Sequence, residues 1–174
     1  IGALLQFLPA AVGAVFRTPL GGWRILCGGW NAGIALMVAG WLGGLPLGTG
    51  CGAVMVAVCT MNFCIAALHS LGTSNGDCLP RVRLALPLLM WPVVAVLGLI
   101  LLGAINGFVA LDLSVWTDIH AIGGIGGVYL VLLLAVAPIA LPLLLGTRRG
   151  GLPTRVMAFL ALFVVVATIV ARAA

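Results

Sequence analysis

Long apolar runs separated by short polar breaks dominate the pattern of this chain. A helix needs about 20 apolar residues to cross a bilayer, and six runs approach or exceed that length. They cover Ile1–Phe16, Trp23–Leu45, Leu47–Leu71, Leu84–Leu111, Trp116–Leu145 and Pro153–Ala171. None shows the alternation of a lipid-facing barrel strand. Helices are therefore the expected spanning structure, because a helix satisfies its backbone hydrogen bonds within one segment.

The composition agrees with this pattern. Of the 174 residues, 64% are hydrophobic and 6% are charged, whereas about 25% of the residues of a soluble domain are charged. No linker or shift of composition divides the chain, although the stretch from Gly72 to Arg83 is rich in turn-forming residues. The sequence predicts an all-α polytopic transmembrane helical bundle of about six spans, forming a single integral-membrane domain over residues 1–174.

The arginines indicate the orientation of the bundle. We call the membrane face that follows the first run face A, and the opposite face, face B. All eight basic residues are arginines, and the six-span pattern puts all but Arg172 on face A, namely Arg17, Arg24, Arg81, Arg83, Arg148, Arg149 and Arg155. Because basic residues gather on the cytoplasmic side, we expect a multi-pass protein of the bacterial cytoplasmic (inner) membrane with face A in the cytoplasm. Arginines at the ends of apolar runs also account for the net charge of +5, so the expected partner is the lipid bilayer and no nucleic acid.

The first run is short, with sixteen residues before Arg17 and no initial Met. We expect the natural chain to continue upstream of Ile1. The alternative is a tilted or shallow helix in a complete subunit.

His120 is the most promising residue for chemistry. It begins the fifth run, near face B, and is followed by a glycine-rich segment with Gly123, Gly124, Gly126 and Gly127. Ionisable residues at membrane depth usually face the protein interior, and imidazole is a common haem ligand. The glycines, above all Gly123, Gly124 and Gly127, provide a surface for a flat macrocycle or for a closely packed helix, and the sequence leaves both interpretations open.

His69 ends the third run near face A, so we expect it about 20–30 Å from His120. One iron cannot bind both histidines at that distance, and an interface position is the favoured interpretation of His69. Met55, Cys59 and His69 share one helical face, and sulfur with imidazole suits Cu(I). Helix packing is an alternative explanation for these residues on one face. Copper is therefore less favoured than haem as a cofactor.

The five cysteines contain no CxxC pair or CxxCH motif, and no nucleotide-binding, zinc-protease or serine-hydrolase motif is present. The three carboxylates are not paired within a span, which leaves a proton-driven transporter little to use. Whether the chain is an enzyme stays open.

Two segments resemble a known family. The first is Ile1-Gly-Ala-Leu-Leu-Gln-Phe-Leu-Pro9, and the second is the His-Ala-x-Gly-Gly-x-Gly-Gly run from His120, followed by Ala137-Pro-Ile-Ala-Leu-Pro142. Both resemble segments of bacterial membrane proteins related to the catalytic subunit of haem-copper oxidases and of the NnrS type. The resemblance implies that His120 binds haem near the outer face. Independently of it, we expect the neighbouring Asp118 to orient a polar group at that face, as partners of ligating histidines do. Without a His-His pair or a Tyr near a His, it does not imply oxygen reduction by this chain alone.

Three classes of function follow from the sequence. The first is a haem or haem-copper membrane protein linked to respiratory electron transport, as a subunit of a larger complex. The second is a non-catalytic structural subunit, and the third is a transporter of a small solute or a metal. Other membrane subunits, or further copies of this chain, are the expected protein partners.

Overall fold

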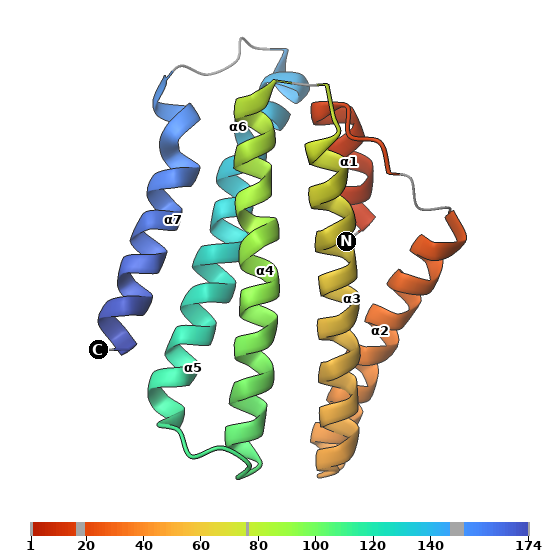
Figure 1. The fold of residues 1–174 in the computed structure, drawn as a ribbon, viewed down its shortest axis with the longest axis vertical. Coiled ribbons are helices and arrows are strands. Elements are labelled where there is room, and N and C mark those ends of the chain that lie inside the picture. Colours follow the sequence, from red (N-terminus) through yellow and green to blue (C-terminus); the bar gives the residue numbers. More distant parts are fainter. Residues whose placement is uncertain (1, 17–19, 76, 147–151, 174) are drawn as a thin grey trace.

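The computed structural model describes residues 2–16, 20–75, 77–146 and 152–173, and every regular element in these ranges is helical. Figure 1 shows a bundle of helices that run along one long axis. In chain order the elements are α1 (Gly2–Val12), α2 (Leu20–Leu42), α3 (Pro46–Gly72), α4 (Cys78–Ile105), α5 (Leu113–Ala121), the π-helix η1 (Ile122–Leu130), α6 (Val131–Leu145) and α7 (Leu152–Ala173).

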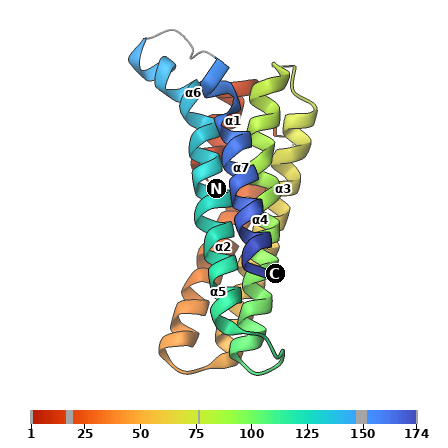
Figure 2. The ribbon, with the colours of Figure 1, turned by 90° about the vertical axis from the view of Figure 1, so that its left-hand side faces the viewer.

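Five helical segments of the described residues are long and apolar enough to cross a membrane. They are Gly22–Leu42, Pro46–Gly72, Cys78–Ile105, Leu113–Pro142 and Val156–Ala173. The fourth of these combines α5, η1 and most of α6, which follow one another without a break (Figures 1 and 2). Membrane-spanning helices in an apolar bundle point to a lipid bilayer as the surroundings of this protein.

The first run forms a shorter helix than the sequence predicts. The expected segment was Ile1–Phe16, whereas α1 has 11 residues and is about 16 Å long at 1.5 Å per residue, against about 30 Å of hydrocarbon. It ends at Gly13, whose φ of 65° is left-handed and whose N–H donates to the carbonyl of Pro9 at 3.0 Å. Glycine adopts this conformation without strain. Within the described residues the bundle thus has five long segments and the short α1, which is roughly consistent with about six spans.

Three other helix boundaries differ from the prediction. The fourth run was expected at Leu84–Leu111, but α4 covers Cys78–Ile105. It begins earlier because Pro80 lies in the first turn of the helix, where proline removes no helical hydrogen bond. It ends earlier because Gly107 has a φ of 77°. In the same way Gly44, with a φ of 62°, follows the end of α2 at Leu42.

α1 packs into the core near face A. Its buried residues Leu4, Leu8 and Val12 are spaced four apart, so they lie on one helical face. They belong to a core cluster that includes Phe63 of α3 and Leu88 of α4. Four edge-to-face ring contacts connect the segment after α1, α2, α3 and α4: Phe16–Trp23, Trp23–Phe63, Phe63–Trp91 and Trp91–Trp30.

α2 and α3 form an antiparallel hairpin in which glycines allow the two backbones to touch. A Cβ atom on Gly52 would lie 2.4 Å from the backbone nitrogen of Met37, and one on Gly40 would lie 2.4 Å from that of Thr49. Small residues at such crossings permit the dense packing that stabilises helix pairs in membranes.

The arginines of the described residues are arranged as the six-span pattern predicts. The α3–α4 connection, with Arg81 and Arg83 after it, is at the upper end of the bundle in Figure 1, which corresponds to face A. The α2–α3 and α4–α5 connections are at the opposite end. Arg17, Arg148 and Arg149 lie outside the described residues, as does the side chain of Arg155.

Candidate functional site

Asp112 determines where the helix that carries His120 begins. Its Oδ1 atom accepts hydrogen bonds from the N–H of Ser114 at 2.9 Å, from that of Val115 at 3.4 Å and from the Ser114 hydroxyl at 2.8 Å. This is a helix N-cap, which satisfies N–H groups that the first turn leaves without partners. The bond from the Ser114 hydroxyl, followed by the two backbone bonds, lowers the pKa of Asp112 below its ordinary value.

His120 packs against α4 at a glycine. A Cβ atom on Gly98 would lie 2.9 Å from Cε1 of the imidazole ring and 3.6 Å from each of its nitrogens. The absence of a side chain at Gly98 therefore makes the space that the ring occupies. The Nδ1 atom of His120 is buried and has no hydrogen-bond partner among the described residues. A buried nitrogen without a partner is costly.

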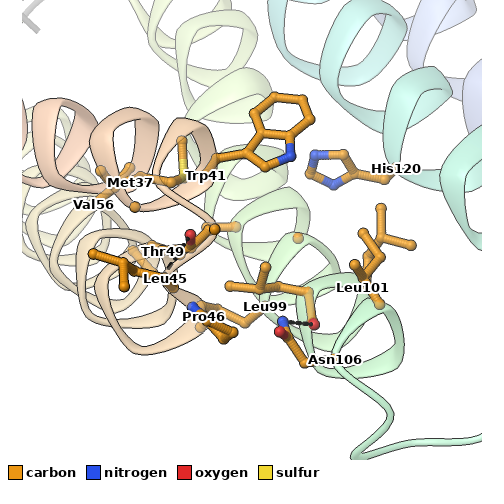
Figure 3. A pocket seen from close by; sticks show the side chains of 18 residues that line it. Met37, Trp41, Leu45, Pro46, Thr49, Val56, Leu99, Leu101, Asn106 and His120 are labelled. Atoms are coloured by element: carbon orange, nitrogen blue, oxygen red, sulfur yellow. Dashed lines mark hydrogen bonds between the residues drawn. The ribbon is translucent and has the colours of Figure 1, made fainter.

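An apolar cleft of about 850 Å³ lies beside His120, toward face B (Figure 3). α2 contributes Met37 and Trp41 to one side, and His120 of α5 lies on the other side. Gly40 of α2, residues of α3 and α4, and the turns that follow α2 and α4 complete the lining, which includes the small residues Gly40, Gly44, Ala53, Ala57, Ala95 and Gly98. Small residues in the lining of a cleft leave its volume free for a ligand.

Few polar groups line this cleft. Asn106 donates from Nδ2 to the carbonyl of Leu102 at 2.7 Å, and the Thr49 hydroxyl donates to the carbonyl of Leu45 at 3.3 Å. In Figure 3 the indole nitrogen of Trp41 points toward the His120 ring. A mostly apolar cavity with a few convergent polar groups is typical of a ligand site.

The glycines after His120 face other helices. A Cβ atom on Gly123 would lie 3.1 Å from Val94 of α4, and one on Gly127 would lie 2.9 Å from Met90 of the same helix. Gly124 is less crowded, at 3.7 Å from Val94. The described contacts of these glycines are thus contacts between helices, and none of the glycines lines the cleft.

The same segment adopts π-helical geometry over Ile122–Leu130. Such geometry is rare and frequently occurs at functional sites. Here it begins two residues after His120.

Asp118 pairs with Arg172 of α7. Its Oδ2 atom lies 2.8 Å from Nη2 and 2.9 Å from Nε of that arginine. The only arginine expected on face B thus connects the last turn of α7 to α5. We expected Asp118 to orient a polar group near His120, and the group that it contacts is this guanidinium.

The structure does not bring His69 and His120 together. His69 is exposed in the last turn of α3, at the end of the bundle opposite to His120. Cys59 of the proposed copper stripe packs toward α2, with its sulfur 3.0 Å from the position of a Cβ on Gly29. Within the described ranges, no three His, Cys, Asp or Glu side chains form a group that could hold a metal ion.

Sequence reasoning missed the cleft residues Met37, Trp41 and Gly98. Met37 and Trp41 are four residues apart and therefore share one face of α2, which is the one signal that the sequence contains. Their position opposite His120 depends on how α2 packs on α3 and how α5 packs on α4.

Comparison with known proteins finds no match for this chain among protein-family models, curated proteins or solved structures.

Proposed function

We propose that this protein is an integral-membrane haem protein linked to respiratory or redox chemistry, and that His120 is an axial ligand of the iron. The observation that supports the proposal most strongly is the imidazole of His120 beside the apolar cleft, with Nδ1 buried and without a partner among the described residues. An imidazole that lines such a cleft can bind an iron through a ring nitrogen.

The residues of the cleft fit a haem in three respects. The cleft volume of about 850 Å³ lies within the range of ordinary cofactor sites. Its lining is apolar, which excludes water and suits a macrocycle. An imidazole is available on one wall. The sequence favours copper less than haem, and the proposal is for haem.

A bound haem would supply one-electron redox chemistry. The residues of this chain would hold the haem and control its surroundings. His120 provides the ligand nitrogen, Gly98 keeps the imidazole in place against α4, and the apolar lining keeps water away. These features influence redox potential through ligand identity and burial.

The proposal includes the bacterial inner membrane as location, with face A in the cytoplasm and other membrane subunits as partners. Cys78 is exposed at the start of α4, beside the α3–α4 connection on face A. In intact cells an impermeant thiol reagent is expected to leave Cys78 unlabelled until the membrane is opened. The control is a Cys78→Ser variant, which removes the labelling site. Labelling of Cys78 from outside would reverse the orientation.

An optical spectrum tests the haem proposal. Wild-type protein is purified in detergent, with and without added iron protoporphyrin IX, and its reduced-minus-oxidised spectrum is recorded. We expect a Soret band in the wild type, its loss or a large shift in His120→Ala, and no change in His69→Ala, the matched control at the other end of the bundle. Absence of haem from the wild type under both conditions would overturn the proposal.

The glycine contacts favour a second candidate, a non-catalytic structural subunit of a membrane complex. The most distinctive run of the sequence packs against Val94 and Met90, which is a structural task. This candidate predicts a partner protein that copurifies in a fixed ratio. It also predicts that the purified complex contains no haem whose binding depends on His120.

A further inference from the structure

We infer that Met37 is the second axial ligand of the iron that His120 binds. This inference rests on the proposed function. It adds a residue that the sequence did not indicate, since the sequence offered no second ligand within this chain.

The arrangement of the helices sets the two side chains on different walls of one cleft. α2 packs on α3 through the glycine contacts at Gly40 and Gly52, and α5 follows α4 and packs on it through His120 and Gly98. Met37 of α2 and His120 of α5 both line the space that remains (Figure 3). Two ligands on facing helices are the usual arrangement for a cofactor held inside a helical bundle.

The chemistry of the lining selects Met37. Haem iron in proteins takes His, Met, Cys or Tyr as axial ligands. Among the described residues that line the cleft, His120 and Met37 are the two of these types. The other polar side chains, Thr49 and Asn106, offer neutral oxygens and already donate to backbone carbonyls of their own segments.

The backbone of Met37 is held in position by α3, which packs against it at Gly52. Its N and Cα atoms lie 2.4 and 2.8 Å from where a Cβ on Gly52 would be, so α3 supports the backbone directly behind this residue. A ligand whose backbone is held in this way loses little freedom when it binds.

Trp41 lies between the two walls. In Figure 3 its indole extends from α2 toward His120, next to the sulfur of Met37. The side chain is 79% exposed, so it can turn without losing core contacts when a planar group enters. We therefore expect the fluorescence of Trp41 to be quenched by bound haem, and a Trp41→Phe variant to lose that part of the quenching.

Three variants of the full chain test the inference. Met37→Leu keeps nearly the same volume and removes the sulfur. Met37→His replaces it with a second imidazole. Met61→Leu, on α3 and away from the cleft, is the matched control. Each protein is loaded with iron protoporphyrin IX, and its haem content, spin state and reduction potential are measured.

We expect the wild type to be low-spin and six-coordinate, with Met37→Leu retaining haem but losing the low-spin form. Met37→His is expected to restore the low-spin form at a lower reduction potential, because Met ligation raises the potential. Unchanged spin state and potential in Met37→Leu, with haem bound through His120, would overturn the assignment of Met37 and leave the proposed function intact. A wild type without haem would overturn both.

Discussion

Replacing Gly52 by alanine is the most direct test of how α2 and α3 pack. A Cβ atom at this position would lie 2.4 Å from the nitrogen of Met37, 2.6 Å from the carbonyl oxygen of Gly33 and 2.8 Å from the Cα of Met37. All three atoms belong to the backbone of α2, so no side chain can rotate away. An ordinary contact needs at least about 3.4 Å, and α2 must therefore move by roughly 1 Å.

The expected cost follows from this displacement. Overpacking of a tight core costs about 1–3 kcal/mol, and a gap of 0.5–1 Å forfeits a quarter to a half of each neighbouring van der Waals contact. Gly50, two residues earlier on α3, has nothing within 4 Å of its Cβ position. Gly50→Ala is thus a matched control that carries the same helix-propensity gain, about 1 kcal/mol, without the clash.

The assay is reversible unfolding of the purified protein in mixed micelles with increasing denaturing detergent, followed by circular dichroism. We expect Gly52→Ala to unfold at a lower denaturant fraction than Gly50→Ala, with a difference of about 1–3 kcal/mol in the free energy of unfolding. Equal stability of the two variants would show that the α2–α3 crossing is looser than the distances at Gly52 indicate. It would also remove the argument that α3 supports the backbone of Met37.

Three further predictions concern the segment around His120. Gly126→Ala should destabilise the protein by about 1–3 kcal/mol in the same assay, because its Cβ would lie 2.7 Å from a stiff valine side chain of α7, whereas Gly124→Ala should be tolerated, since its nearest atom is 3.7 Å away. Arg172→Gln should lower the free energy of unfolding by about 0.2–1 kcal/mol at low salt and by less at high salt, because salt screens its exposed ion pair with Asp118. A double-mutant cycle with Asp118→Asn measures the coupling energy of the pair, and zero coupling at low salt would contradict this prediction. The pKa of Asp112 is lowered in the folded protein, so its charge stabilises the fold at pH values above the ordinary Asp pKa of about 3.9. This stabilisation is lost as the pH falls from there through the lower folded pKa. The wild type should therefore lose stability over this pH range and Asp112→Asn should not, and identical pH profiles would exclude the role of the charge.

The end of the bundle at which His120 lies was predictable from the sequence. Its place at the start of an apolar run determines the end of the bundle at which it lies, and the same argument separates it from His69. The cleft beside it was not predictable, because its walls come from helices that are far apart in the sequence. Met37, Gly98 and His120 meet only when α2 packs on α3, α3 on α4 and α4 on α5.

For the short first helix, the sequence predicted the burial but not the boundary. Its apolar run predicts burial, and Leu4, Leu8 and Val12 are indeed buried. Hydropathy counts apolar residues but does not register that Gly13 takes a left-handed φ, which ends the helix.

By itself the sequence determined that the chain is all-helical, apolar enough for a bilayer and basic at one end, because these properties depend on the residues within each run. The tertiary structure decided which glycines touch a neighbouring backbone, which carboxylate pairs with Arg172, and which side chains share the cleft with His120. Those outcomes depend on the rotation and spacing of helices relative to one another. Because lipid and protein interior are equally apolar, the hydrophobic pattern of a membrane helix does not indicate which of its faces meets a partner.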